Sequence, residues 1–209
     1  MSEVNDLLWV DLETTGSDET RGDEILEIAC IVTDKDLNEV KGEWQSLVRP
    51  SLIGQKRLVE NDFVRKMHME NGLLAELTGE TPDISGVDYR LAEWLDKNFH
   101  RSLPIKKFTL AGSGVAHFDS RFIRGYMPRL SAQLNYFTID VGVIRRSWRE
   151  WVGTEVSNAN EGKTHRAMDD IRCHLEEARA FQKYWQDLEE HRRRDTARRR
   201  EMDFLASQQ

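Results

Sequence analysis

The sequence is poor in cysteine and in long apolar runs, and each shortage excludes a class of protein. Only two of the 209 residues are cysteines, Cys30 and Cys173, which lie far apart in apolar periodic segments. We expect packed, reduced thiols and neither a disulfide nor a metal site at them. No apolar run reaches the roughly 18 to 20 residues that span a bilayer, and the N-terminus lacks a basic-then-apolar signal pattern. The sequence therefore predicts a cytoplasmic protein without a membrane partner.

Positive charge is also scarce, except in one segment. The net charge is −7, yet residues 191–201 carry six arginines against Asp195 and Glu201, a local charge of +4 that leaves −11 for the rest. An acidic surface binds phosphates poorly, so we do not expect long duplex DNA as a partner. We divide the chain into a domain of residues 1–190 and an arginine-rich extension of residues 191–209. The extension is predicted to be either a solvated helix end, favoured by the helix dipole, or a contact for nucleic acid.

Apolar periodicity predicts a single α/β domain without internal repeats. Three strands joined by short turns come first and predict an antiparallel meander; strands and helices then alternate and predict added parallel strands. The expected fold is therefore ribonuclease H-like in outline, a mixed sheet flanked by helices. The predicted strands are residues 7–10, 24–34, 44–49, 108–111 and 136–139, and the predicted helices are residues 60–77, 87–99, 119–128, 141–151 and 167 to the arginine run.

Two acids follow the first strand, one residue apart. Asp11 and Glu13 point to the same face of an extended chain, so their oxygens can approach one point. Two like charges at that spacing raise each other's pKa unless a cation lies between them, and a divalent metal ion explains the pair economically. Such pairs also occur by chance as ordinary solvated acids, so the remaining acids of the chain decide between the two interpretations.

Two later segments supply further acids and a histidine. Asp119 lies in the loop between a short strand and a helix, at the carboxyl edge of the sheet, where ligands of open α/β sheets bind. His165 precedes the last long helix, and Asp170 lies in the first turns of that helix, so the imidazole can overhang the carboxylate. Asp169 and Asp170 differ by about 100° around a helix, so only one can face the same point. We choose Asp170, beside Ile171, and expect Asp169 to be solvated or to cap the helix.

Four carboxylates and one histidine suit phosphodiester hydrolysis with two metal ions. Two Mg²⁺ or Mn²⁺ ions about 3.5 to 4 Å apart hold the attacking and the leaving oxygen of an in-line displacement. Hard cations prefer carboxylate oxygens, and the candidate site contains no cysteine. Histidine has an ordinary pKa near neutrality and can therefore serve as general base toward the attacking water.

The order Asp11-x-Glu13, Asp119, His165-x₄-Asp170 resembles the DEDDh family of 3′–5′ exonucleases, which have a ribonuclease H-like fold. Within that family the chain is most similar to oligoribonuclease, in residues 27–29, 32–38, 126–128, 136, 139–141 and 164–172. The resemblance implies two divalent ions, Mg²⁺ or Mn²⁺, held by Asp11, Glu13, Asp119 and Asp170, with His165 as the base. It also implies a homodimer, and substrate contacts from Thr14, Gly16, Phe63, His68 and the Tyr136 of a partner subunit.

Five positions depart from the oligoribonuclease pattern. Ser17 stands where relatives have a leucine that wedges between two bases. Phe63 stands where they have a base-stacking tryptophan, and any aromatic ring can stack for about 1 to 3 kcal/mol. Val115, Phe137 and Gly142 match positions that bind the substrate's 5′-phosphate in relatives, but none of them has a side-chain hydrogen-bond donor. We therefore expect single strands longer than a dinucleotide to be accepted.

Three functions follow, and the sequence favours the first. It is a metal-dependent 3′–5′ exonuclease that releases 5′-mononucleotides from short single-stranded RNA. One alternative is an exonuclease of single-stranded DNA, similar to polymerase proofreading subunits or ribonuclease T. The other is a nucleic-acid-binding relative without catalysis, which the five filled site positions disfavour.

Overall fold

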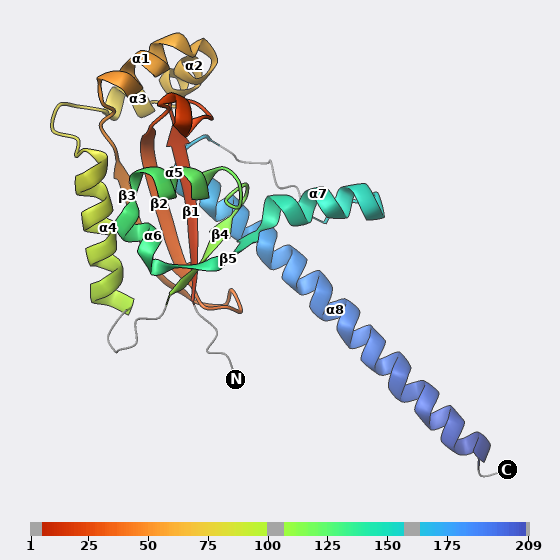
Figure 1. Cartoon of the computed structure of the whole chain (residues 1–209). Helices are drawn as coiled ribbons and strands as arrows, with labels where there is room; N and C mark the ends of the chain where they lie inside the picture. Colours follow the sequence, from red (N-terminus) through yellow and green to blue (C-terminus); the bar gives the residue numbers. More distant parts are fainter. Residues whose placement is uncertain (1–5, 100–106, 157–163, 208–209) are drawn as a thin grey trace.

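One five-stranded sheet organises the chain, as a computed structural model of residues 6–99, 107–156 and 164–207 shows (Figure 1). The strand order is β3-β2-β1-β4-β5, so the first strand lies in the centre of the sheet. The pairs β1–β2 and β2–β3 are antiparallel, whereas β1–β4 and β4–β5 are parallel. The predicted mixed sheet is therefore confirmed. The strands are β1 (Leu7–Thr14), β2 (Ile25–Thr33), β3 (Val40–Leu47), β4 (Phe108–Gly112) and β5 (Leu134–Asp140).

The third strand lies earlier in the chain than predicted. β3 runs from Val40 to Leu47 and not over residues 44–49. It is an edge strand on which the side chains of Val40 and Lys41 are exposed, so its first half lacks the apolar residues that mark a buried strand. Beyond the strand, the backbone N–H of Arg49 donates to the carbonyl of Pro82 at 2.8 Å, outside the ladder.

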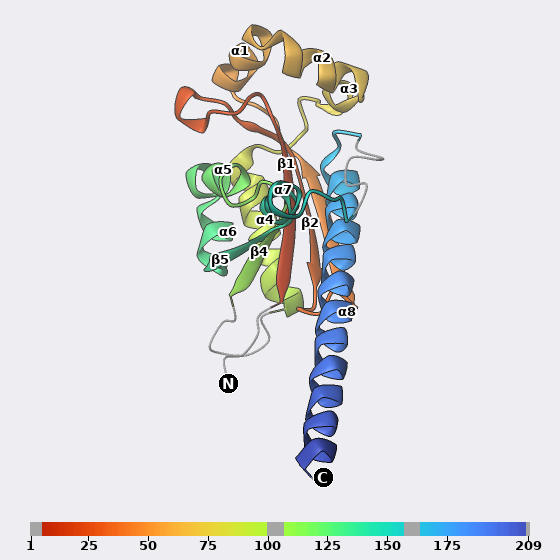
Figure 2. The same cartoon turned by 90° about the vertical axis from the view of Figure 1, so that its right-hand side faces the viewer.

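Helices cover both faces of the sheet and one end of it (Figures 1 and 2). They are α1 (Leu52–Glu60), α2 (Asp62–Glu70), α3 (Leu73–Glu76), α4 (Ile84–Phe99), α5 (Asp119–Tyr126), α6 (Pro128–Gln133), α7 (Val141–Val152) and α8 (Ala167–Ser207), with a 3₁₀ turn at Glu19–Arg21. The helix predicted over residues 60–77 is broken at Asn71-Gly72 into α2 and α3, as that dipeptide indicated.

Two helices were not predicted. In α1 only Gly54 and Leu58 are buried, so the segment has no apolar stripe that periodicity could detect. Its start is nevertheless marked by Ser51, whose hydroxyl oxygen accepts hydrogen bonds from two backbone N–H groups of the first turn. Pro128 was expected only to close α5, but it also begins α6, because proline suits the first position of a helix.

The two faces of the sheet are separate cores. Leu8, Val10 and Leu12 of β1 pack on one face, against residues of α4, α5 and α6. Leu7 and Trp9 pack on the other face, against the first turns of α8. The period of two along β1 therefore also places Asp11 and Glu13 on the α8 side of the sheet. This alternation positions the candidate site.

The last helix extends well past the body of the protein. α8 lies along the sheet with its first turns and then continues alone toward the C-terminus (Figures 1 and 2). Its last buried residue is Phe181, and none of residues 182–203 is buried. The residues before and after position 191 belong to this one helix, so the arginine-rich segment begins without a break in secondary structure.

The two cysteines differ in exposure: Cys30 is buried, Cys173 is half-buried, and neither forms a disulfide. Burial raises the pKa of the Cys30 thiol far above its ordinary value, which makes it unreactive. Among the described helices, none combines the length and the apolar character that a bilayer span requires.

Candidate active site

The end of β1 carries the first two acids. Asp11 lies opposite Ala29 of β2, and Glu13 lies opposite Glu27, in the antiparallel register. Glu13 is only 6% exposed. Asp11 and Glu13 thus lie on the central strand of the sheet. Because they are two residues apart, both side chains point toward the start of α8.

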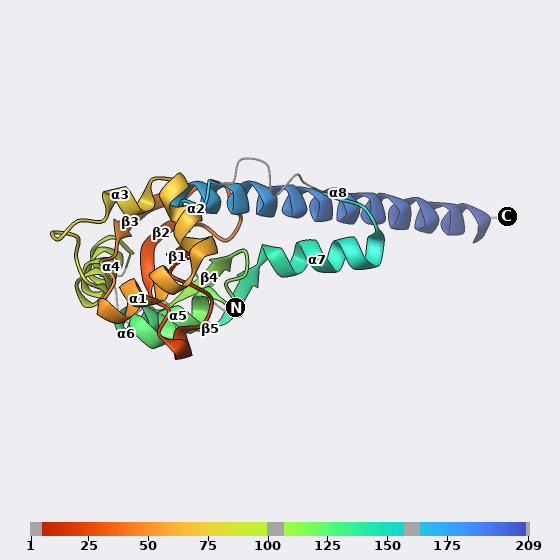
Figure 3. The same ribbon diagram turned by 90° about the horizontal axis from the view of Figure 1, so that it is seen from above.

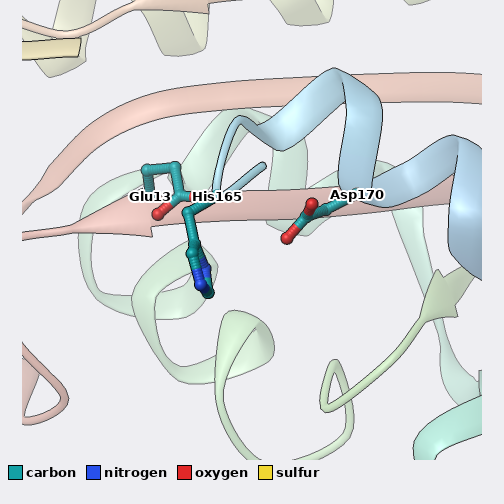
Figure 4. A group of neighbouring side chains, drawn as sticks. All are labelled: Glu13, His165 and Asp170. Atoms are coloured by element: carbon teal, nitrogen blue, oxygen red, sulfur yellow. The ribbon is translucent and has the colours of Figure 1, made fainter. Parts of the chain in front are cut away.

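The start of α8 brings an acid and a histidine to Glu13. Ligand atoms of Glu13, His165 and Asp170 all lie within 4.8 Å of one another. Figure 4 shows the imidazole of His165 and the carboxylate of Asp170 extending into the same space. Asp170 is buried, whereas His165 is exposed and therefore accessible to a substrate. This grouping of residues from two ends of the chain is the core of the candidate site.

Asp169 faces elsewhere. Its carboxylate accepts a hydrogen bond from the hydroxyl of Thr164 at 2.9 Å and lies 3.8 Å from Arg172, with about half of the side chain exposed. Asp170 accepts a hydrogen bond from the backbone N–H of Thr164 at 3.3 Å. The geometry therefore agrees with the choice of Asp170, and Asp169 is partly solvated, the first of the two expected alternatives.

His165 is held in an uncommon backbone conformation. Its φ is +53°, in the left-handed region that non-glycine residues seldom adopt. The side chain of Asn71, at the break between α2 and α3, donates a hydrogen bond to the carbonyl of His165. This contact ties the histidine loop to the helices that cover the end of the sheet.

A buried ion pair anchors the start of α8, and sequence reasoning did not identify it. The guanidinium of Arg166 donates to Glu27 at 3.0 and 3.2 Å and to Glu76 at 2.8 and 3.0 Å. Glu27 also accepts a hydrogen bond from the backbone N–H of Ala167 at 3.1 Å. The signal in the sequence was an acid within the apolar run of β2, which needs a partner when it is buried.

Asp119 approaches β1 from a distant part of the sequence. It is the first residue of α5 and is 3% exposed. Burial raises its pKa to about 7, although the backbone N–H groups of Asp119 itself and of Leu12 act in the opposite direction. The backbone hydrogen bond from Leu12, the residue between Asp11 and Glu13 in sequence, brings Asp119 to β1. It is not among the three residues whose ligand atoms lie within 4.8 Å of one another, but its charge acts on Glu13.

Glu13 has a strongly perturbed pKa. Its pKa is raised to about 8, first by burial and then by the negative charges of Asp170, Glu27 and Asp119, while Arg166 lowers it. A buried carboxylate surrounded by other carboxylates is stable in its charged form only with a cation beside it. An all-oxygen set of this kind fits a hard divalent ion. The residues present therefore fit a divalent metal centre.

Two more buried polar residues of α8 lie behind the acids. His174 is 2% exposed, and its Nδ1 lies 3.8 Å from a carboxylate oxygen of Asp11. Glu177 is 2% exposed and accepts a hydrogen bond from Arg145 of α7 at 2.7 Å. Sequence reasoning missed both. The signal was their spacing, because Asp170, His174 and Glu177 follow one another at steps of four and three and so share one helix face.

Three predicted substrate residues have structural contacts of their own. His68 is fully buried and its Nε2 lies 3.0 Å from the carbonyl oxygen of Thr14, with burial lowering its pKa. The hydroxyl of Thr14 donates to the carbonyl of Gly16 at 2.6 Å. A Cβ at Gly16 would lie 2.4 Å from the carboxylate of Asp23, so only glycine fits there. The structure thus places His68 beneath the end of β1, where it supports the backbone of Thr14.

The two predicted aromatic contacts are exposed. Phe63 on α2 is 78% exposed and Tyr136 on β5 is 93% exposed. Such surface aromatics are available to stack on a base or to contact a second chain. Neither belongs to the cluster of Glu13, His165 and Asp170.

Three positions match those that bind the 5′-phosphate in oligoribonucleases, but they hold residues without a side-chain donor here. Val115 is fully buried, and Phe137 is exposed without a polar group. A Cβ at Gly142 would lie 2.7 Å from the hydroxyl oxygen of Ser113. Nearby, Asp140 caps α7 and accepts backbone hydrogen bonds from Gly114, Ala116 and Val143.

Comparison with known proteins first gives the class of protein to which the chain belongs. Residues 8–178 match the exonuclease family of the ribonuclease T type. The structure of E. coli exonuclease I in complex with a dT13 oligonucleotide is similar in fold, with a TM-score of 0.61 and 16% identity, over 90% of this chain and 43% of that one. The nuclease domain of 3′hExo, a DEDDh family member bound to rAMP, has a TM-score of 0.54 and 17% identity, over 89% and 94% of the two chains. The chain belongs to the exonuclease family.

Sequence relatives narrow the assignment. The oligoribonuclease of Haemophilus ducreyi is 34% identical over 86% of this chain and 93% of that protein. That of Actinobacillus pleuropneumoniae is 33% identical over 88% and 95%, and a probable oligoribonuclease of Drosophila melanogaster is 32% identical over 82% and 78%. Within the exonucleases, the chain therefore groups with the oligoribonucleases. The predicted resemblance is confirmed.

Proposed function

We propose that this protein hydrolyses short single-stranded RNA from its 3′ end and releases 5′-mononucleotides. The observation that carries the proposal is the convergence of Glu13, His165 and Asp170 within 4.8 Å, in a chain of the oligoribonuclease group. The raised pKa values of Glu13 and Asp119 support the presence of divalent cations during function. A catalytically inert relative would have no need to bury these acids together.

The acids hold the cations in this proposal. Asp11, Glu13, Asp119 and Asp170 would bind two ions, Mg²⁺ or Mn²⁺. When bound, such ions supply charge stabilisation to the attacking and leaving oxygens of the phosphodiester. The chain's own contribution is geometric: β1 fixes Asp11 and Glu13, and the ion pair of Arg166 with Glu27 fixes the helix that carries Asp170.

His165 takes the proton of the attacking water. The imidazole is exposed beside the buried acids, so it reaches both the substrate and the solvent. A neutral imidazole at that position accepts the water proton, and solvent exposure lets it release the proton afterwards. Its backbone carbonyl is fixed by Asn71, which limits the movement of the loop.

The substrate would be held by backbone and aromatic groups. We place the terminal nucleotide over Thr14 and Gly16, with a base stacked on Phe63. Because β5 is an edge strand with Tyr136, Phe137 and Ile139 exposed, we propose a homodimer in which the partner's Tyr136 covers the substrate. The lack of donors at Val115, Phe137 and Gly142 supports the acceptance of strands longer than two nucleotides.

A second candidate substrate is single-stranded DNA. E. coli exonuclease I, which shares the fold, was solved with a dT13 oligonucleotide. The relatives of higher identity are oligoribonucleases, which favours RNA. The cytoplasmic location expected from the sequence stays a prediction.

A length and sugar series tests this proposal. Labelled RNA and DNA strands are incubated with Mg²⁺, with Mn²⁺ or with a chelator. Their lengths range from two nucleotides to the length that one single-strand-binding site covers. We expect 5′-mononucleotides from short RNA with either ion and no product with chelator. Faster turnover of long DNA than of short RNA would favour the second candidate. A protein inert toward every strand in both metals would exclude both.

A further inference from the structure

The outer part of α8 is a solvent-exposed arm with no role in the proposed site. We define the arm as residues 186–203, which follow the last buried residue, Phe181, and contain no buried residue themselves. In Figures 1 and 2 the arm lies apart from every other helix and strand of the protein. A helical segment that lies clear of the described helices and strands is available to contact a partner.

The pattern of the arm disfavours a coiled coil. Apolar residues at steps of three and four reach Trp185 and Leu188 and then stop. The next positions of that series are Arg192, Asp195 and Arg199, which cannot form an apolar seam. A helix that is polar on all sides is stabilised by charge pairs or by a charged partner.

The two arginine triplets of the arm differ in their partners. Arg192 and Arg193 both pair with Glu189, at 2.7 and 2.9 Å, and Arg194 pairs with Glu190. For the second triplet, Arg198 to Arg200, the described part of the chain provides no carboxylate within 4 Å. All three of these side chains are exposed. Within the described residues, the second triplet therefore carries three exposed guanidinium groups that form no salt bridge.

The helix sets the distance between this triplet and the candidate active site. Asp170 and Arg198 lie on the same helix, 28 positions apart, which corresponds to about 42 Å. At the spacing of about 3.4 Å per phosphate along one strand of a duplex, this distance equals roughly twelve nucleotides, and fewer for a more extended strand. A strand whose 3′ end lies at Asp170 can thus reach the triplet only when it is about this long.

We propose that Arg198, Arg199 and Arg200 bind phosphates of a single-stranded nucleic acid whose 3′ end occupies the active site. The inference rests on the proposed function and extends it to longer substrates. Guanidinium groups match phosphate oxygens in a bidentate manner, and the triplet belongs to residues 191–201, a segment of charge +4 in a chain that carries −11 elsewhere. An acidic protein partner would match the charge as well, but it would give no dependence on strand length.

Binding in the presence of chelator tests the proposal without hydrolysis. The full chain and R198Q/R199Q/R200Q are titrated with labelled RNA of about four and of about sixteen nucleotides, one too short and one long enough to span the distance. We expect the variant to bind the long strand about ten- to a hundredfold more weakly at about 0.1 M salt, with a salt slope lower by about 2. The short strand should bind equally to both proteins. Glutamine keeps helix propensity close to that of arginine, and circular dichroism checks the helix.

The first triplet provides the matched control. R192Q/R193Q/R194Q removes the same number of charges from the same helix, but these arginines are already neutralised by Glu189 and Glu190. We expect a smaller loss of affinity for the long strand. Equal losses of affinity in both variants, or no loss of affinity in the R198Q/R199Q/R200Q variant, would overturn the assignment of the second triplet. So would a change of oligomeric state in the R198Q/R199Q/R200Q variant, which would identify the arm as a contact between copies.

Activity separates this proposal from the proposed function. If the parent protein cleaves short RNA and the R198Q/R199Q/R200Q variant keeps the KM of the parent for the long strand, the arm proposal fails and the exonuclease assignment stands. If the parent cleaves nothing but the variant still loses affinity for the long strand, the arm proposal stands and the proposed function fails.

Discussion

Asp169 and Asp170 are neighbours in sequence, but they occupy different environments. Asp169 is half-exposed and accepts a hydrogen bond from the hydroxyl of Thr164, whereas Asp170 is buried beside Glu13. The rotation of a helix by about 100° per residue produces this difference. The pair therefore offers two equivalent substitutions with opposite expected results.

We expect Asp170→Asn to abolish hydrolysis and Asp169→Asn to preserve it within a factor of about three, because only Asp170 faces the proposed metal centre. The measurement is the initial rate on a short RNA in Mg²⁺, together with Mg²⁺ binding by calorimetry. Asp170→Asn should also weaken Mg²⁺ binding. Equal activity of the two variants would show that Asp170 is not a ligand.

In the proposed mechanism, His165 contributes to the rate through proton transfer and not through the fold. We expect His165→Ala to lower the rate by about 10² to 10⁴ while metal binding and thermal stability stay near those of the parent. The exposed position of the imidazole supports this separation, because its removal leaves no buried cavity. The decisive measurement is the pH–rate profile: a variant that keeps the acidic limb of the parent would exclude His165 as the base.

At the scale of elements, the start of α8 depends on one buried ion pair. Arg166 bridges Glu27 of β2 and Glu76 of α3, so it ties a strand and two helices together next to the acids. Side-chain exposure is 24% for Arg166 and 5% for Glu27. Without Arg166, the charge of Glu27 would therefore be left uncompensated in a poorly solvated position.

We expect Arg166→Gln to lower the free energy of unfolding by about 3 kcal/mol, because the buried carboxylate of Glu27 loses its partner. Arg172→Gln is the control, since its pair with Glu43 is exposed on both sides and should contribute less than about 1 kcal/mol. Urea denaturation of both variants gives the comparison. A loss at Arg166 no greater than that at Arg172 would contradict the anchoring role.

Periodicity predicted most elements of the fold, and the exceptions have physical reasons. The strand before Asp11 was predictable because it is a run of apolar residues buried on both faces. The helix of Asp170 was predictable because its apolar residues recur with the helical period along one face. α1 was missed because it buries only Gly54 and Leu58, and β3 was displaced because it is an edge strand. The acids of the site were found by their order in the chain. Their anchors, such as Arg166 with Glu27, join residues far apart in sequence and have no local pattern.

At the scale of the whole molecule, charge is divided between an acidic body and a basic arm. The body concentrates carboxylates around the end of β1, and the second arginine triplet lies far along α8. The exposed aromatics of β5 lie on the edge of the sheet, where a second copy can add contacts. We expect light scattering to give the mass of a dimer, and Tyr136→Ala to lower activity more than it lowers dimer content.

Stability should depend on pH and on divalent cations together. Glu13 has a pKa of about 8 in the folded protein against an ordinary value of 4.5, so between these values the folded state retains a proton that the unfolded chain has lost. Folding stability in chelator therefore falls as the pH rises through this window, and Asp119, raised from 3.8 to about 7, acts in the same direction. A bound divalent ion takes the place of these protons, so the increase in Tm on adding Mg²⁺ should be larger at high pH than at low pH. Thermal melts across the window, with Glu13→Gln as the comparison, measure this. The substitution should flatten the pH dependence in chelator and reduce the Mg²⁺ effect, and an unchanged Mg²⁺ effect would place the cations away from Glu13.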